Sequence, residues 1–536
     1  MTHGMVSTAQ PEAVEAGLEA LKAGGNAVDA AVATALVQTV VDPQMCGIAG
    51  FGSLHVYDPR RGLHECLDFH GRAPLSAKPD MWEKLLVGEA EDGFGFLLAD
   101  RVNEIGYGAI TSPMTLRALD EALRRYGTRR LGDLLAPAID YAEQGFMVRP
   151  HVAAYWAQVP TEGRAPHAEM LTTLPATRKI YAKADGSLRR MGEVLANPDM
   201  AATLRRVRDH GAEDFYAGEI ARRIVADMKA NGGLISEADL ASARPETTPP
   251  LWGSYRGLKI ATNRPPGGGV MLIEMLNILE HFDLKAMGHN SPDYIATVAE
   301  AMKIATVDKD AKVGDPRFVD VPLDELTSKA YAEPLAARIR RGEKTSVPRV
   351  RATQKESADT THVVAVDENG VIATMTHSLG TPSGVVTEGL GFMYNGAMAV
   401  FDPRPGRAGS LAPGKSRFSS LAPSILFKDG VPVLALGAPG GTYIAMGILQ
   451  VILNVVEFGM TAAEAVAAPR FNATSDTLDV TNRILRATEA ELKRRGYPVR
   501  RWPMTFHFAG VHAIRIVDGR LDGGADPGRD GMAMAV

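Results

Sequence analysis

Three pairs of short, β-rich runs, each joined by a tight turn, recur through the last third of this 536-residue chain. In the first pair, Thr361–Asp367 and Val371–Thr376 flank a Glu-Asn-Gly turn. Alternating apolar residues on both sides of an Asn-Gly or Asp-Gly turn predict an antiparallel hairpin. The other two pairs cover 424–427 with 431–437, and 511–517 with 520–521. Antiparallel strands bury one face against a covering layer, so the chain must also supply helices.

The first half of the chain carries those helical patterns. Two helical segments, Pro11–Ala23 and Ala27–Val41, are separated by the break Gly24-Gly25-Asn26. Residues 113–245 are mostly amphipathic helix by pattern. Further helical patterns cover 270–281, 444–457 and 461–468. Helices first, then paired strands with inserted helices, indicate an α+β fold in which antiparallel sheets are covered by helices.

Composition argues against several classes of protein. A formal net charge of −5 gives no basic footprint, so nucleic acid is not an expected partner. Residues 1–20 contain glutamates but no apolar segment, so we expect no secretory signal and a cytoplasmic location. The apolar stretches 27–41 and 444–456 are short and interrupted by polar residues, which predicts buried helices and no membrane partner.

The cysteines and histidines give no sign of a metal or cofactor site. Cys46 and Cys66 are the two cysteines, which fits a reducing compartment. They could form one disulfide but not a disulfide framework. The sequence has no H-x-x-x-H pair and no C-x-x-C motif, so we expect neither a metal ion nor another cofactor.

The pattern changes abruptly at Thr360. Residues 340–359 are charged and lack hydrophobic periodicity, and a β-branched strand pattern begins directly after them. Exposed polar backbone of this kind is where chains are cleaved. A cut between Asp359 and Thr360 would give Thr360 a free α-amine beside its own hydroxyl, which makes a nucleophile with a built-in base. This pattern alone equally fits a threonine that opens an ordinary hairpin.

Two loops near the second hairpin could assist such a nucleophile. Residues 437–442 read Gly-Ala-Pro-Gly-Gly-Thr between a strand and a helix, where backbone amides can form an oxyanion hole. The alternative interpretation is a tight strand-to-helix turn. In the stretch Arg417–Pro423, the adjacent Ser419 and Ser420 offer hydroxyl donors to a substrate carboxylate or oxyanion.

One motif match points to a different chemistry. Gly409–Ser416 satisfies the phosphate-binding pattern G-x-x-x-x-G-K-S. That motif requires a buried strand before it and a helix after it. Prolines precede the match, and Pro423 and a strand follow it, so we expect a loop and no nucleotide site.

Taken together and in this order, these segments resemble the γ-glutamyltransferase family (glutathione hydrolases) of N-terminal-nucleophile hydrolases. The resemblance spans nearly the whole chain and includes the sequence around Thr360-Thr361-His362. The other matching segments lie at 23–30, 46–52, 215–220, 265–269, 314–320, 419–420, 439–441, 468–471 and 525–527.

The resemblance implies a fold, a processing event and catalytic roles. The fold would be an αββα sandwich with a helix-rich first half. The precursor would cut itself into fragments 1–359 and 360–536, which would stay together as one intertwined unit. The Thr360 amine would activate the Thr360 hydroxyl, the amides of Gly440 and Gly441 would hold the oxyanion, and Ser378 would orient the nucleophile.

Three positions depart from the family pattern for a glutamyl head group. His70 stands where the family has the arginine that grips the substrate α-carboxylate. Val400 replaces the acidic residue for the α-amine, and Gly380 replaces an asparagine. Losing the acidic partner would leave a buried ammonium unpaired, at a cost on the order of several kcal/mol. If residues 70–72 are extended, Arg72 would lie on the same face as His70 and could hold an anionic group.

These departures predict an autoprocessing amidohydrolase or acyltransferase with an altered acyl pocket. It would cleave a small carboxylate-bearing amide through an acyl-enzyme on Thr360 and pass the acyl group to water or an amine. The first alternative is a genuine γ-glutamyltranspeptidase with a rebuilt pocket. The second is an uncleaved binding protein on the same fold. In each case the two parts of the chain associate, and a homo-oligomer is compatible with the sequence.

Overall fold

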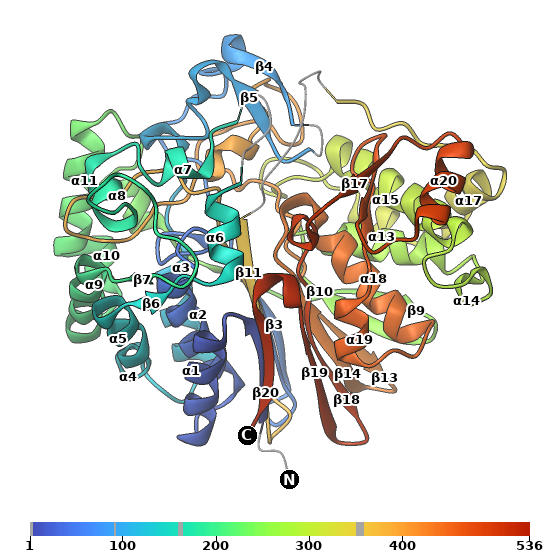
Figure 1. The fold of residues 1–536 in the computed structure, drawn as a ribbon, viewed down its shortest axis with the longest axis horizontal. Helices are drawn as coiled ribbons and strands as arrows, with labels where there is room; N and C mark the ends of the chain where they lie inside the picture. Colours follow the sequence, from blue (N-terminus) through green and yellow to red (C-terminus); the bar gives the residue numbers. More distant parts are fainter. Residues whose placement is uncertain (1–3, 91–92, 159–163, 350–358) are drawn as a thin grey trace.

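The computed structural model describes residues 4–90, 93–158, 164–349 and 359–536. Two sheets lie face to face in the middle of the molecule, and helices cover the outer face of each (Figure 1). The described N-terminal and C-terminal strands end at the same edge of the sandwich (Figure 1). This arrangement is the predicted αββα sandwich, because each sheet buries one face against the other sheet and one against helices.

The first sheet has seven strands, and all neighbours that pair within it are antiparallel. Their order is β20 (Gly531–Ala535), β1 (Gly4–Ala9), β11 (Asp359–Asp367), β12 (Ile372–Gly380), β2 (Phe51–Asp58), β3 (Leu63–Phe69) and β8 (Glu246–Thr248). The predicted hairpin across the Asn-Gly turn is therefore confirmed as β11–β12, at the centre of the sheet. This sheet mixes strands from before and after the predicted cut, whereas the position of the cut stays a prediction.

The second sheet has six antiparallel strands. Their order is β19 (Arg520–Ala525), β18 (His512–Val517), β14 (Val431–Gly437), β13 (Ser424–Lys428), β10 (Leu258–Thr262) and β9 (Leu251–Tyr255). Alternate residues of β11 face this sheet: Val364 and Val366 pack in one buried cluster with Ile425 and Ile514. The other two predicted hairpins are thus confirmed as β13–β14 and β18–β19.

Helices from the first half of the chain cover the outer face of the first sheet. α1 (Pro11–Lys22) and α2 (Ala27–Val41) form the predicted helical hairpin. The Asn26 side chain caps α2 by accepting hydrogen bonds from the backbone N–H groups of Val28 and Asp29, and the Asp29 carboxylate accepts one from the Asn26 N–H. Around them lie α3 (Thr115–Tyr126), α4 (Leu131–Leu134), α5 (Ala136–Gln144), α6 (Pro150–Trp156), α7 (His167–Met170), α8 (Pro175–Tyr181), α9 (Pro198–His210), α10 (Glu213–Ala217), α11 (Glu219–Ala230), α12 (Glu237–Ser242) and the short pair β6 (Phe146–Met147) and β7 (Val194–Leu195).

A second group of helices covers the outer face of the other sheet (Figure 1). It consists of α13 (Gly269–Leu279), α14 (Leu284–Met287), α15 (Pro292–Lys312), α16 (Leu323–Leu326), α17 (Lys329–Arg340), α18 (Ile444–Val456), α19 (Ala462–Ala467) and α20 (Arg486–Arg494), with a small sheet of β15 (Phe471–Asn472), β16 (Leu478–Thr481) and β17 (Val499–Trp502). β4 (Leu86–Glu89) and β5 (Phe96–Leu98) form a separate hairpin. Within the described ranges, no helix combines the length and apolarity needed to cross a membrane. Cys46 and Cys66 are buried free thiols.

Candidate active site

Thr360 is the second residue of β11 and lies at an irregularity in the pairing with β12. The register shifts between Asp359 and Thr361, so that Ser378 and Leu379 of β12 stand opposite Thr360 alone, and such an irregularity re-aims the side chains beside it. The Thr360 Oγ1 lies 3.0 Å from the Ser378 Oγ. The Gly380 backbone N–H donates to the same Ser378 oxygen at 2.8 Å. Since Thr360 is 4% and Ser378 1% exposed, the two hydroxyls form a buried pair.

A buried polar network holds the strands behind this pair. The Gln38 side chain of α2 donates to the Thr361 Oγ1 at 2.8 Å and to the Thr8 Oγ1 at 2.7 Å. The His377 Nε2 lies 3.0 Å from the Gln38 Oε1. Burial lowers the pKa of His377 to about 3, so the neutral ring donates its Nε2–H to the amide oxygen. Because Thr361 and His377 adjoin Thr360 and Ser378 in sequence, this network fixes the backbone that carries the hydroxyl pair.

His362 has a structural position between the two sheets. Its Nδ1 lies 2.8 Å from the Thr376 Oγ1, and its Nε2 lies 3.0 Å from the Thr374 Oγ1. Burial holds the pKa of His362 well below its ordinary value, so the ring is neutral. A Cβ on Gly437 would lie 2.2 Å from the His362 ring, so only glycine fits there. His362 therefore orients β11 against the second sheet.

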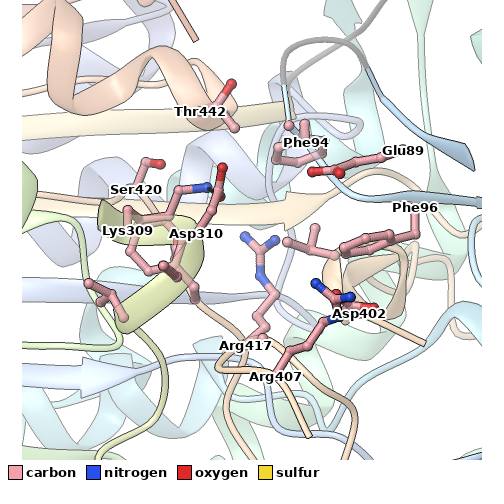
Figure 2. A pocket seen from close by; sticks show the side chains of 18 of the residues that line it. Glu89, Phe94, Phe96, Lys309, Asp310, Asp402, Arg407, Arg417, Ser420 and Thr442 are labelled. Atoms are coloured by element: carbon pink, nitrogen blue, oxygen red, sulfur yellow. Dashed lines mark ion pairs between the residues drawn. The ribbon is translucent and has the colours of Figure 1, made fainter. Parts of the chain in front are cut away.

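Thr360 lines a cavity of about 440 Å³, which we call the nucleophile cavity. Ser419, Ser420, Val400 and Gly441 line it as well, and Figure 2 shows Ser420 and Thr442 among the side chains around it. The structure therefore brings these sequence-predicted residues together around Thr360. Ser378 and Gly380 complete the group from behind, through the hydrogen bonds of the hydroxyl pair.

The paired glycines form the predicted strand-to-helix turn after β14. Gly440 has φ +138°, and a Cβ there would lie 2.6 Å from the Ala509 Cα, so the position requires glycine. Gly441, with φ +54°, begins the turn η5 (Gly441–Tyr443), which leads into α18. A helix N-terminus directs positive dipole and backbone N–H groups outward. This end of the nucleophile cavity therefore suits a developing oxyanion.

His70 and Arg72 do not lie in the nucleophile cavity. They line a second cavity of about 670 Å³, which we call the flanking cavity. The extended backbone does place both side chains toward one space, as expected, but Thr360 does not line that space. The Arg72 guanidinium donates to the Glu246 carboxylate at 2.5 Å, and the His70 Nε2 lies 3.6 Å from the Asp68 Oδ1. The expectation that these two residues grip a substrate at Thr360 gains no support from this geometry.

Arg417 is a residue of the nucleophile cavity to which the sequence analysis gave no role. Its side chain is 5% exposed, and its guanidinium carbon lies 4.6 Å above the ring of Phe51 and 5.8 Å from that of Phe94. Burial lowers the pKa of Arg417 to about 9. The sequence signal that could have revealed Arg417 as a site residue is its position two residues before Ser419, in the stretch Arg417–Pro423.

The three carboxylates that line the nucleophile cavity are all taken up by ion pairs. Glu89 lies 3.2 Å from Arg349, and Asp402 lies 2.7 Å from Arg404. Asp310 pairs with Lys309 and also with Arg349. Within the described part of the chain, none of these acids is left over for a substrate ammonium. Against these three acids, five cationic side chains line the cavity: Lys309, Arg349, Arg404, Arg407 and Arg417. The lining therefore favours an anionic ligand.

Comparisons with known proteins agree with this arrangement. A family model described as gamma-glutamyltranspeptidase matches residues 13–536. The chain is 38% identical to the acylase ACY 1 proenzyme of Pseudomonas sp. strain V22, over 100% of this chain and 94% of that protein. It is 32% identical to the glutathione hydrolase proenzyme of Bacillus subtilis strain 168, over 99% of this chain and 91% of that protein.

A solved structure shows the same fold. The crystal structure of a cephalosporin acylase from Bacillus halodurans matches with a TM-score of 0.87 and 30% identity, over 99% of this chain and 96% of that one. The resemblance and the fold class inferred from sequence are thereby confirmed. The chain belongs to the gamma-glutamyltranspeptidase family and is an autoprocessing N-terminal-nucleophile amidohydrolase.

Proposed function

We propose that this enzyme hydrolyses small amides whose acyl group carries a carboxylate but no neighbouring ammonium. The observation that carries the proposal is the lining of the nucleophile cavity: it keeps the hydroxyl pair of Thr360 and Ser378, and its three acids are already ion-paired. Val400 is apolar where the family pattern has an acid. A substrate ammonium would therefore enter this cavity without a partner.

Thr360 would act as nucleophile once the bond to Asp359 is cut. The freed α-amine takes the proton of the Thr360 hydroxyl while the Thr360 Oγ1 attacks the amide carbonyl carbon. The oxyanion forms beside Gly440 and Gly441. The amine then returns the proton to the leaving nitrogen, the carbon–nitrogen bond breaks, and an ester on Thr360 remains. Water then attacks the ester carbonyl carbon while the α-amine takes a proton from the water. The amine returns the proton to the Thr360 oxygen as the ester bond breaks, and the carboxylic acid is released.

Ser378 fits the role of orienting this hydroxyl. Its oxygen accepts from the Gly380 N–H, and in this role its hydroxyl would donate to the Thr360 oxygen 3.0 Å away. Donation from Ser378 would occupy one of the two lone pairs of the Thr360 oxygen and would so fix the orientation of this hydroxyl. Such preorganisation is effective because the pair is buried and needs no rearrangement during the reaction.

Glutathione hydrolysis is the second candidate function. Its support is the similarity to the glutathione hydrolase proenzyme of Bacillus subtilis. The similarity to the acylase ACY 1 proenzyme, at 38% identity, favours the first candidate. The lining of the cavity supports the same choice, since desolvating an unpaired ammonium costs on the order of several kcal/mol.

A matched set of para-nitroanilides tests the proposal. Glutaryl and γ-glutamyl anilides share one carbon chain and carry the carboxylate alone or the carboxylate with the ammonium, and the γ-aminobutyryl anilide is the γ-glutamyl one without its carboxylate. We expect the purified, two-fragment enzyme to give the highest kcat/KM with the glutaryl anilide. A γ-glutamyl anilide that is turned over faster than the glutaryl one would contradict the proposal and favour the second candidate. A single full-length species without turnover would favour a binding protein.

A further inference from the structure

We infer that Arg417 is the carboxylate-binding residue of the nucleophile cavity and selects acyl groups with a terminal carboxylate. This inference rests on the proposed function and names the residue that would give it its specificity. The site assigned is the guanidinium of Arg417 together with the aromatic walls beside it. The ligand class is a monoamide of a linear dicarboxylic acid.

Arg417 is a buried cation that lacks an acidic partner in the described part of the chain. Among the residues that the structure describes, no carboxylate forms an ion pair with Arg417, and its Nε has no hydrogen-bond partner. The other cations of the cavity differ, because each has an acidic partner: Lys309 with Asp310, Arg349 with Glu89, and both Arg404 and Arg407 with Asp402. A buried guanidinium without an anion is costly unless a ligand supplies one.

The direction in which Arg417 points supports the same inference. Figure 2 shows its guanidinium in the middle of the cavity, between Lys309 and Asp310 on one side and Phe94 and Glu89 on the other. Packing over the ring of Phe51 holds its plane in place. A planar guanidinium offers two parallel N–H groups that match the two oxygens of a carboxylate. The fork is therefore oriented in advance for a bidentate contact.

The space between Arg417 and the nucleophile supports it as well. Both residues line the same cavity of about 440 Å³, whose remaining lining includes Val400, Phe94 and Phe96. Apolar walls suit the methylene chain that joins a carboxylate to the scissile amide. An acyl group with one charged end and an uncharged chain matches a cavity that combines a cation with apolar walls.

The rival anchor is Arg72, which sequence reasoning considered for an anionic group. Its guanidinium donates to Glu246 and to the Arg244 carbonyl oxygen, and it lines the flanking cavity. Arg72 therefore already has its anion, whereas Arg417 does not. This difference supplies a matched control, since the two arginines lie in neighbouring cavities.

The test compares Arg417→Met, Arg417→Lys and Arg72→Met on two substrates. Glutaryl and pentanoyl para-nitroanilides have the same carbon chain and differ only in the terminal carboxylate. We expect Arg417→Met to lower the ratio of their kcat/KM values by about 100-fold, because the bidentate charged contact is lost. Arg417→Lys should restore part of that ratio, and Arg72→Met should leave the ratio within about threefold of the parent value. An unchanged ratio in Arg417→Met, or an equal drop in Arg72→Met, would overturn the inference.

A binding measurement separates failure of the inference from failure of the proposed function. Free glutarate should raise the melting temperature of the parent enzyme, and this shift should be absent in Arg417→Met. A parent enzyme that binds glutarate through Arg417 but cleaves neither anilide would refute the proposed reaction and keep the binding site. Equal stabilisation of parent and variant by glutarate would refute the binding site, whatever the activity. A denaturing gel of each variant confirms that chain cleavage has occurred before either measurement.

Discussion

Consecutive residues line the two cavities, Ser416 the flanking cavity and residues 417–421 the nucleophile cavity, yet the charges of the two cavities are arranged differently. In the flanking cavity Arg72 pairs with Glu246, and Arg317 pairs with Asp315 and Glu246. Ser416, at the boundary, donates its backbone N–H to Asp315 at 2.7 Å. These four side chains pair with one another, whereas Arg264, which also lines the flanking cavity, donates to the Pro249 carbonyl oxygen.

In the nucleophile cavity the pairing is incomplete, because Arg417 has aromatic neighbours instead of an acid. Ion pairs of this kind hold a loop in place, whereas a buried cation that shares a cavity with a nucleophile and lacks an acidic partner among the described residues is available to a ligand. Whether a cationic side chain can bind substrate therefore depends on whether it already has an acidic partner, and not on its position in a motif.

The largest expected effect is the loss of chain cleavage and turnover when Thr360 of the nucleophile cavity is changed, compared with a change in the flanking cavity. Thr360→Ala should yield one full-length chain and lose at least about 10⁴-fold in turnover, because it removes the hydroxyl that forms the ester. Thr360→Ser keeps the hydroxyl and should still be cut. His70→Gln, in the flanking cavity, should also give two fragments. Intact mass and anilide turnover check all three, and a Thr360→Ala protein that is still cut before residue 360 would disprove the assignment.

Changing Val400 should move the nucleophile cavity toward a glutamyl substrate. Val400, at the end of η4 (Ala397–Val400), lines the cavity. Val400→Asp would supply a carboxylate for an α-ammonium, so we expect the ratio of γ-glutamyl to glutaryl turnover to rise by roughly tenfold or more. Val400→Asn is the control without charge and should change the ratio less. A ratio that does not rise in Val400→Asp would show that the ammonium does not reach this position.

The pH dependence should differ between a charged and an uncharged substrate. Arg417 carries its charge below its pKa of about 9 and loses it above. We therefore expect kcat/KM for the glutaryl anilide to fall as the pH rises through about 9, by roughly tenfold at pH 10, while the pentanoyl anilide shows no such fall. The charged groups that face Arg417 across the cavity are Lys309, Asp310, Arg349, Glu89, Asp402, Arg404 and Arg407. Identical profiles for both substrates would argue against Arg417 as the anchor.

The smallest expected effect is on stability, and its sign differs between the cavities. Arg417→Met removes a buried charge without an acidic partner, so the free energy of unfolding should rise by about 1–2 kcal/mol at neutral pH. Burial lowers the pKa of Arg417, so its destabilising contribution is present at neutral pH and fades as the pH rises through about 9. Arg72→Met breaks a pair with a half-exposed Glu246 and should lower stability by about 0.5–1 kcal/mol. Chemical denaturation of the two variants measures both signs.

Much of the fold could be predicted because its signals are local. The hairpin β11–β12 follows from alternating residues around one Asn-Gly turn, and α1 and α2 follow from helical patterns broken at Gly24–Asn26. β1 and β20 were not predicted. β1 lies between β20 and β11, whose residues are hundreds of positions away in the chain. A strand paired only with distant partners has no turn beside it to reveal it.

The sequence by itself determined the chemistry of the candidate site: a threonine at a strand start, a hydroxyl partner at Ser378, and a glycine turn before α18. The threonine and the glycine turn follow from residue type and spacing, whereas Ser378 follows from the resemblance to the family. The tertiary structure alone decided which charges face the nucleophile, because ion pairing joins residues from separate elements. It placed His70 and Arg72 in the flanking cavity and put Arg417 in the same cavity as Thr360, with no acidic partner among the residues that the structure describes. Charge availability depends on burial and on partners in space, and neither is written in the local sequence.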